Sequence, residues 1–223
     1  MPLHLRPGTA ADAPALSKIC LLTGNFGTSA EHLHTHRELL GLVYAEPYVR
    51  MQGTYAFVLV HTPEQKQKEG PEQVVGYIIG AYDTPAFEAE MAREWFPPLA
   101  EKYPVGGEGT LLDKWFYRLF ANPPRTAEDV TSLYPSHLHI DILPSYQRSG
   151  WGRKMVDTVV RHLSSRGYRG VWAGIDSRNE EGRKWYVKLG FRRVESTVGE
   201  YWVMDFERWD GERGRPVGQV TAG

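Results

Sequence analysis

Hydrophobic and polar residues alternate in several short stretches of the chain, which is the pattern of β-strands with one buried face. The first stretch is Leu3–Arg6, and Pro7–Gly8 interrupts it. Two longer stretches, Tyr55–Val60 and Val74–Ala81, are rich in β-branched and aromatic residues. They predict a strand pair joined by a polar loop over residues 61–73. The first half of the chain therefore contributes three strands.

Helical periodicity fills the intervals between these strands. Thr9 can cap a helix whose apolar residues recur at helical spacing. These residues are Ala13, Leu16, Ile19 and Cys20. Residues 32–43 predict a second helix. Between residues 84 and 133, three helical pieces are separated by Pro and Gly, at Ala86–Leu99, Leu111–Ala121 and Ala127–Leu133. We interpret them as an insertion, because a segment of this length buries little core of its own.

The last third of the chain has the clearest alternation of strands and helices. Strands are expected at Leu138–Leu143, Val171–Ile175, Phe191–Val194 and Tyr201–Phe206, and helices at Gly150–Arg166 and Asn179–Leu189. This order predicts an α/β (α+β) fold, a mixed, twisted sheet of about six or seven strands flanked by helices. We expect one domain over residues 1–210 and a disordered tail over 211–223.

Composition narrows the class of protein. The 26 basic and 27 acidic side chains nearly cancel, which favours neither nucleic acid nor a membrane surface as a partner. Cys20 is the one cysteine, so an intrachain disulfide is ruled out. His32, His34 and His36 recur at short spacing, but no metal is expected, because no carboxylate is fixed beside them. A secretory signal is not visible. We expect a cytoplasmic protein, with the nucleus as an alternative.

One turn carries the candidate chemistry. The strand Leu138–Leu143 leads into Gln147–Arg153, where a helix begins. Free amides at a helix start donate hydrogen bonds and carry a partial positive charge. Two glycines let an anion approach the backbone, and Arg148 or Arg153 can add a charged contact. These residues predict a site for the anion of coenzyme A or of a nucleotide, unless the glycines serve packing alone. Met155 stands where a dinucleotide-binding motif has its third glycine.

Two segments resemble signatures of the GCN5-related N-acetyltransferase (GNAT) superfamily. Its first motif has Gln or Arg, then Gly three positions later and Gly or Ala two positions after that. Gln147, Gly150 and Gly152 match these positions. The run Asn179–Phe191 resembles the second signature, although Gly182 replaces the usual alanine.

Three further segments extend the resemblance. Leu5–Leu16 is similar to the first strand and helix of the superfamily. Tyr77–Phe87 and His139–Pro144 resemble a narrower group, the stand-alone acetyltransferases similar to the C-terminal acetyltransferase-like domain of O-GlcNAcase. The resemblance implies the GNAT fold, acetyl-CoA as cofactor, and transfer of the acetyl group to a primary amine of a small molecule, an amino sugar or a protein lysine. The alternative is a catalytically inactive GNAT-like binding module. A homodimer stays open.

The resemblance also implies roles for individual residues. Tyr186 matches the general acid that protonates the leaving sulfur, although it could be plain aromatic core. Asn179 is expected to contact the pantetheine or pyrophosphate arm, to cap its helix, or both. A backbone amide of Ile142 or Leu143 is expected to polarise the thioester carbonyl. The full set of expected cofactor contacts is Ile142, Leu143, Gln147, Arg148, Ser149, Gly150, Trp151, Gly152, Arg153, Asn179 and Tyr186.

The general base has more than one candidate. His137, His139 and Asp141 alternate along one face of a strand. His139 has a suitable ordinary pKa, and Asp141 could act directly, through water, or by orienting the histidine. These polar groups could instead be satisfied within the fold. Three weaker candidates for substrate contact are Tyr48, Asp83 and Asp176.

Overall fold

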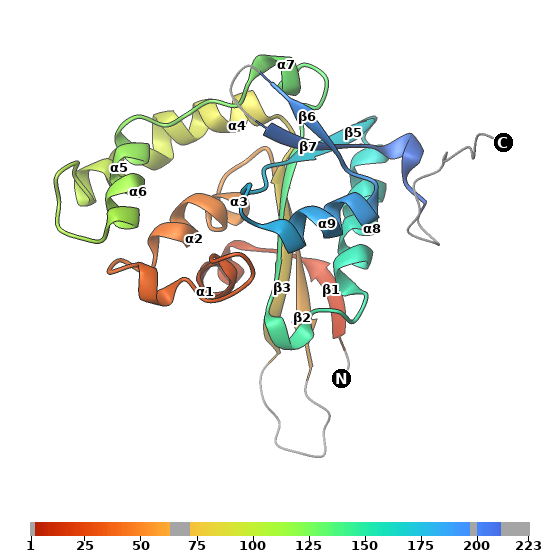
Figure 1. Cartoon of the computed structure of the whole chain (residues 1–223), viewed down its shortest axis with the longest axis horizontal. Helices are drawn as coiled ribbons and strands as arrows, with labels where there is room; N and C mark the ends of the chain where they lie inside the picture. Colours follow the sequence, from red (N-terminus) through yellow and green to blue (C-terminus); the bar gives the residue numbers. More distant parts are fainter. Residues whose placement is uncertain (1–2, 63–71, 197–199, 211–223) are drawn as a thin grey trace.

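A seven-stranded mixed sheet forms the centre of the molecule (Figure 1). The computed structural model describes residues 3–62, 72–196 and 200–210, so most of the predicted 61–73 loop and the predicted tail lie outside the described residues. The strand order is β1-β2-β3-β4-β5-β7-β6, and only the pair β4 and β5 is parallel. The strands are β1 (Leu3–Pro7), β2 (Thr54–His61), β3 (Gln73–Ala81), β4 (His137–Ile142), β5 (Gly170–Ala173), β6 (Arg192–Glu195) and β7 (Glu200–Asp205). The mixed α/β architecture predicted from the sequence is confirmed.

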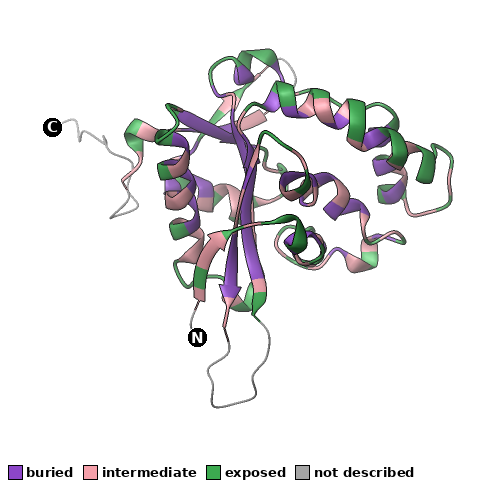
Figure 2. Ribbon diagram, turned by 180° about the vertical axis from the view of Figure 1, so that it is seen from behind, coloured by how far each residue is buried: buried purple, intermediate pink, exposed green. Residues whose placement is uncertain are grey.

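Helices cover both faces of this sheet, and each face has its own core (Figures 1 and 2). Tyr77 and Ile79 of β3 face one core, whereas Ile78 faces the other, because successive side chains of a strand point to opposite faces. The first core is covered by α1 (Ala13–Thr23), α2 (Leu39–Tyr44), α3 (Pro47–Arg50), α4 (Thr84–Glu90), α5 (Phe96–Lys102) and α6 (Leu111–Ala121). The second is covered by α8 (Trp151–Ser164) and α9 (Glu180–Leu189).

The segment between β3 and β4 is helical, as predicted. It contains α4, α5 and α6, then α7 (Glu128–Thr131), and a π-helical stretch at Met91–Trp95 joins α4 to α5. Helix α6 begins with a capping box in which Thr110 and Asp113 bond each other's amides. Among the described residues, no helix is both long and apolar enough to cross a bilayer.

The helix predicted over residues 32–43 is wrong in its first half. A short 3-10 turn at Glu31–Leu33 is followed by irregular backbone, and α2 starts only at Leu39. The carboxylate of Asp113 accepts hydrogen bonds from the ring of His34 (2.8 Å) and the amide of Thr35 (2.9 Å). These contacts with a residue far along the chain replace helical bonds, and local periodicity contains no sign of them.

Strands β4 and β5 separate soon after they meet. Their one paired position is His137 with Trp172, beside a hydrogen bond from the Trp172 amide to the Ser136 carbonyl (3.0 Å). Strand β5 ends at Ala173, two residues before its predicted end, whereas β4 continues to Ile142. A wedge therefore opens beside the second half of β4, between the two helical layers.

Candidate active site

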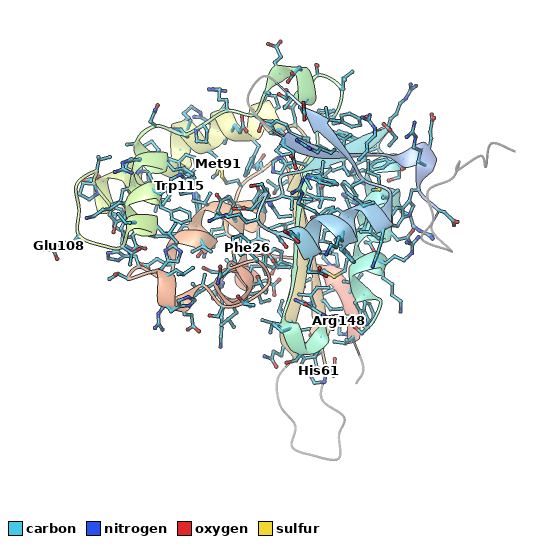
Figure 3. The ribbon with its side chains drawn as sticks, in the orientation of Figure 1. Phe26, His61, Met91, Glu108, Trp115 and Arg148 are labelled. Carbon is cyan, nitrogen blue, oxygen red and sulfur yellow. The ribbon has the colours of Figure 1, made fainter. Side chains whose placement is uncertain are left out.

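A groove of about 1280 Å³ occupies this wedge. It is lined by β4, by the turn before α8, by α9, and by the end of α1 together with residues 24–34, α2 and α6. We call it the splay groove. Figure 3 labels Arg148 in the turn before α8, Phe26 after α1 and Trp115 on α6, which mark its three sides. The predicted phosphate turn, the polar face of β4 and the insertion therefore meet at one cavity.

The turn before α8 is open and left-handed. Arg148 has φ 58° and Gly150 has φ 83°, and a Cβ built on Gly150 would meet nothing within 4 Å. No side chain of the described residues caps α8, so the amides of its first turn, at Trp151, Gly152 and Arg153, keep their hydrogen-bonding capacity. The Gln147 amide group donates to the Ile142 carbonyl (2.7 Å) and ties the turn to β4. These features suit an anion.

The two glycines of the turn differ in purpose. Gly150 allows the left-handed backbone and open access. Gly152 is required by packing, because a Cβ there would lie 2.9 Å from the ring of Trp185. Gln147, Arg148, Gly150, Gly152 and Arg153 all line the splay groove, whereas Ser149 and Trp151 do not.

The hydrogen bonds at the end of β4 indicate which backbone amide faces the groove. The amide of Leu143 donates to the Val75 carbonyl of β3 (2.9 Å), so it is already engaged. Amides alternate in direction along a strand, so that of Ile142 points the other way, where β5 has ended. The Ile142 carbonyl confirms this direction, because it accepts the hydrogen bond from Gln147. Of the two residues expected to polarise a carbonyl, only Ile142 is placed to do so.

Asp141 is a half-buried carboxyl group facing the groove. The buried Tyr77 lies opposite it in the register of β3, and its hydroxyl donates to Asp141 Oδ2 (2.6 Å). Burial raises the pKa of Asp141 to about 6, although hydrogen bonds from Tyr77 and Thr23 counteract part of that shift. A carboxyl group with this pKa is an effective base near neutral pH.

A buried hydrogen-bond chain connects His139 to the backbone. The Thr84 hydroxyl lies 2.7 Å from the Pro135 carbonyl and 2.8 Å from His137 Nδ1. The Tyr48 hydroxyl lies 2.8 Å from His137 Nε2 and 3.1 Å from His139 Nε2. Each contact needs one proton, so the protons can be assigned by counting.

The Pro135 carbonyl has no proton, so Thr84 must donate to it, and His137 must then donate from Nδ1 to Thr84. Burial lowers the pKa of His137 well below its ordinary value, so the ring is neutral and its Nε2 accepts from Tyr48. The Tyr48 oxygen in turn accepts from Nε2–H of His139. His139, whose pKa burial lowers to about 4, therefore keeps a lone pair on Nδ1, and its ring lines the groove.

Tyr186 of α9 and Asn179, the residue just before this helix, both line the groove. Asn179 caps α9 by accepting from the amide of Gly182 (2.9 Å). A Cβ at Gly182 would lie 2.6 Å from the Asn179 side chain, which explains the departure from alanine. The hydroxyl of Tyr186 makes no hydrogen bond to the described part of the chain, and burial raises the pKa of this hydroxyl above its ordinary value. It therefore stays protonated and available.

The weaker candidates for substrate contact separate into three cases. Asp176 lines the groove, but its carboxylate is held by Arg178 (2.8 Å). Tyr48 does not line the groove and acts behind it, between the two histidines. Asp83 was expected beside the acceptor but does not line the groove. It is an exposed residue that caps α4 by accepting from the Ala86 amide (2.9 Å).

Sequence reasoning missed several residues that shape the site. Tyr77, Thr84 and Asp113 act through contacts with distant segments, and no local pattern reveals them. His34 was considered only as a metal ligand, yet it lines the groove. Among the described residues, no group of three or more His, Cys, Asp or Glu side chains is placed to hold a metal ion.

Comparison with known proteins gives a family match for part of the chain and a fold match for most of it. A family model described as the acetyltransferase (GNAT) family matches residues 115–191, from α6 to the end of α9. The crystal structure of SsHAT resembles this chain with a TM-score of 0.76 and 29% sequence identity, covering 92% of this chain and 99% of its own. Residues 115–191 thus match the GNAT family model, and the chain has the GNAT fold. The narrower resemblance to the O-GlcNAcase-like group stays a prediction.

Two other proteins are similar to this chain. Mycothiol acetyltransferase of Paenarthrobacter aurescens (strain TC1) is 29% identical over 112 residues, which are 50% of this chain and 33% of that protein. The chain thus spans about a third of the length of this curated relative. Arabidopsis thaliana NAA60, crystallised in complex with acetyl-CoA, has a TM-score of 0.50 at 12% identity, with 91% of this chain and 96% of its own covered, and shows the fold alone.

Proposed function

We propose that this GNAT protein is an acetyl-CoA-dependent acetyltransferase that acts on a primary amine. The observation that carries the proposal is the open start of α8, which faces the same groove as the Asp141 carboxyl and the free Tyr186 hydroxyl. An anion-binding end and a proton-transfer end in one cavity are what transfer from a diphosphate-bearing thioester requires.

The turn before α8 would hold the diphosphate of coenzyme A. The amides of Trp151, Gly152 and Arg153 supply neutral donors, and the side chains of Arg148 and Arg153 add positive charge. Arg153 is also anchored, since its guanidinium donates to the Asp210 carbonyl and lies 4.7 Å from the ring centre of Trp209. When bound, acetyl-CoA supplies an acetyl group activated as a thioester.

Asp141 is the better base of the two candidates on β4. At pH 7 a carboxyl with a pKa of about 6 is ionised, and it binds a proton more tightly than a histidine whose pKa is about 4. Asp141 would therefore take the proton of the bound ammonium. His139 would orient the amine by accepting a second N–H at Nδ1.

Two further groups of the chain, the Ile142 amide and the Tyr186 hydroxyl, act in the remaining steps. The Ile142 amide stabilises the negative charge that forms on the carbonyl oxygen as the amine nitrogen bonds to the carbonyl carbon. The carbon–sulfur bond breaks, and Tyr186 donates its hydroxyl proton to the leaving thiolate. The bound ammonium must lose two protons to become an acetamide: Asp141 takes the first before attack, and the second passes from the amine nitrogen to the phenolate that Tyr186 becomes after it protonates the thiolate. The products are an acetamide and a neutral thiol, with Tyr186 protonated again and one proton left on Asp141.

An inactive binding module is less well supported by these contacts. Such a module has no use for a carboxyl with a raised pKa beside a tyrosine hydroxyl that has no partner in the described chain. Its groove would need only the contacts that bind a ligand.

The test is a matched pair of glycine variants. Gly150 and Gly167 have φ values of 83° and 85°, both lie at ends of α8, and neither has atoms near a built Cβ. Wild-type protein with acetyl-CoA at 100 times its Kd should be stabilised by about 2.7 kcal/mol in a thermal-shift assay. Gly150→Glu should abolish this shift through steric block and charge repulsion. Gly167→Glu should keep it.

A Gly150→Glu variant that retains the full shift would refute the assigned cofactor site. If wild-type protein shows no shift at millimolar acetyl-CoA, the proposed function itself fails.

A further inference from the structure

The far end of the splay groove is walled by apolar and aromatic side chains. They come from residues 30–44 and from α6 of the insertion, and we call them the aromatic wall: Leu33, Leu40, Tyr44, Leu112, Trp115 and Phe116. Ring contacts run along it without a break. Trp115 lies 5.0 Å from Phe116, Phe116 lies 6.2 Å from Tyr44, and Tyr44 lies 5.9 Å from His139 (centroid distances). The wall thus reaches the polar face of β4.

Charge is distributed unevenly along the groove. Three carboxylates line its described part, at Asp141, Asp176 and Glu181. Asp176 is paired with Arg178 and Glu181 with Lys184, each at 2.8 Å. Asp141 is bound by Tyr77, a neutral group, so its negative charge is not matched by a cation in the described structure. The groove therefore offers an incoming cation one uncompensated carboxylate, at the end of the aromatic wall.

The wall is fixed in place by a buried carboxylate. Asp113 of α6 is fully buried and accepts from His34 and Thr35 on one side and from the Thr110 amide (2.9 Å) on the other. These bonds join the insertion to residues 34–35, so the two parts of the wall form one surface. Its shape is set before any ligand binds.

We propose that the acceptor is a monoamine carried on an apolar, aromatic body, with its ammonium at Asp141 and its body against the aromatic wall. This inference rests on the proposed function and names its substrate class. A polyamine would place further ammonium groups along a wall that has no carboxylate. An amino sugar would bury hydroxyls against rings and methyl groups, and each unpaired hydroxyl costs about 1–3 kcal/mol.

The experiment measures release of the coenzyme A thiol at saturating acetyl-CoA. The amines are phenethylamine, isoamylamine, spermidine, glucosamine and a short lysine peptide. Phenethylamine should have a kcat/KM at least tenfold above those of spermidine, glucosamine and the peptide, with isoamylamine between them. A higher kcat/KM for any of these three than for phenethylamine would overturn the acceptor class.

Variants on one helix locate the acceptor. Leu112 and Trp115 line the groove and are about half exposed, whereas Leu111 on the same helix is 86% exposed and does not line it. Trp115→Ala should raise the KM for phenethylamine about tenfold and leave the KM for acetyl-CoA unchanged, and Leu111→Ala should change neither. Leu112→Asp should raise kcat/KM for spermidine by supplying the missing carboxylate.

The acceptor class and the proposed function would be overturned by different results. A protein that binds acetyl-CoA but acetylates none of the five amines would overturn the acceptor class and leave the cofactor site standing. Equal effects of Trp115→Ala and Leu111→Ala would also overturn it. A protein that does not bind acetyl-CoA would overturn the proposed function and this inference with it.

Discussion

The surroundings of Asp141 favour its neutral form and raise its pKa to about 6, so its proposed role as the base can be tested by varying the pH. If Asp141 is the base, kcat/KM should fall as pH drops through about 6, because the carboxyl then becomes protonated. Asp141→Asn should lower kcat/KM about 100-fold, within the usual range for loss of a general base. In the variant, kcat/KM should no longer decrease as pH falls through about 6. A pH–rate profile of both proteins measures this decrease. If the variant keeps it, a group other than Asp141 causes it.

The same substitution should stabilise the fold. The folded pKa of Asp141 is about 6 and the ordinary value is 3.8, so between these values the folded state binds more protons than the unfolded state. The neutral carboxyl therefore stabilises the folded state at low pH, and this stability is lost as pH rises from about 4 to about 6. At pH 7.5, Asp141→Asn should raise the free energy of unfolding by about 1–2 kcal/mol. Urea melts of both proteins measure the difference.

Tyr48 determines which nitrogen of His139 carries the proton. Tyr48→Phe removes the acceptor for His139 Nε2–H and the donor for His137 Nε2. The Nδ1–H form of His139 should then appear in ¹⁵N NMR spectra, where wild type shows the Nε2–H form alone. Turnover should fall about tenfold, the equivalent of one hydrogen bond of ~1.4 kcal/mol.

Tyr103→Phe is the matched control for this prediction. The Tyr103 hydroxyl donates to Glu38 (2.6 Å) and lies outside the splay groove. The control should keep both the turnover and the imidazole spectrum of wild type. Identical His139 spectra in Tyr48→Phe and wild type would contradict the assigned proton order.

At the scale of elements, α6 depends on Asp113 for its attachment. An asparagine there keeps one acceptor oxygen, but its NH₂ group faces backbone amides that also donate. Asp113→Asn should therefore cost about 2 kcal/mol, which lowers the Tm of a chain of this size by about 4–8 °C. It should raise the KM for the amine more than that for acetyl-CoA.

Glu108→Gln removes the same charge near the start of α6, from an exposed side chain, and should leave the Tm unchanged. If both variants melt alike, Asp113 does not hold the insertion in place. Differential scanning calorimetry compares them directly.

The helices and strands show how far sequence patterns predict this structure. Strands with strong alternation and helices that end at Gly167 and Gly190 were located to within a few residues, because those signals are local. The phosphate turn was found through Gln147, Gly150 and Gly152, which are neighbours in sequence. Residues 34–38 were wrongly assigned to a helix, because Asp113, 79 positions from His34, determines their conformation.

At the scale of the whole molecule, the parts of the site that patterns missed are those assembled across the sheet. Tyr48 reaches His137 over 89 positions, and Thr84 reaches it over 53. The sequence of β4 alone predicted that His139 and Asp141 lie on one polar face of the strand. It did not reveal Tyr48 and Tyr77, whose hydroxyl groups bond to these two side chains and influence where their protons lie. The two cores explain this, since each collects side chains from segments that only the folded sheet brings together.

The left-handed turn before α8 has a kinetic consequence for the proposed function. Arg148 already adopts a left-handed conformation that a non-glycine residue of an unfolded chain rarely visits, at a cost of about 1–2 kcal/mol, and Gly150 holds the left-handed backbone beside it. That cost, with the loss of backbone freedom, falls on folding and not on association. An arriving diphosphate would meet a cradle that needs no rearrangement, so its capture would be limited by diffusion and charge steering instead of by loop closure.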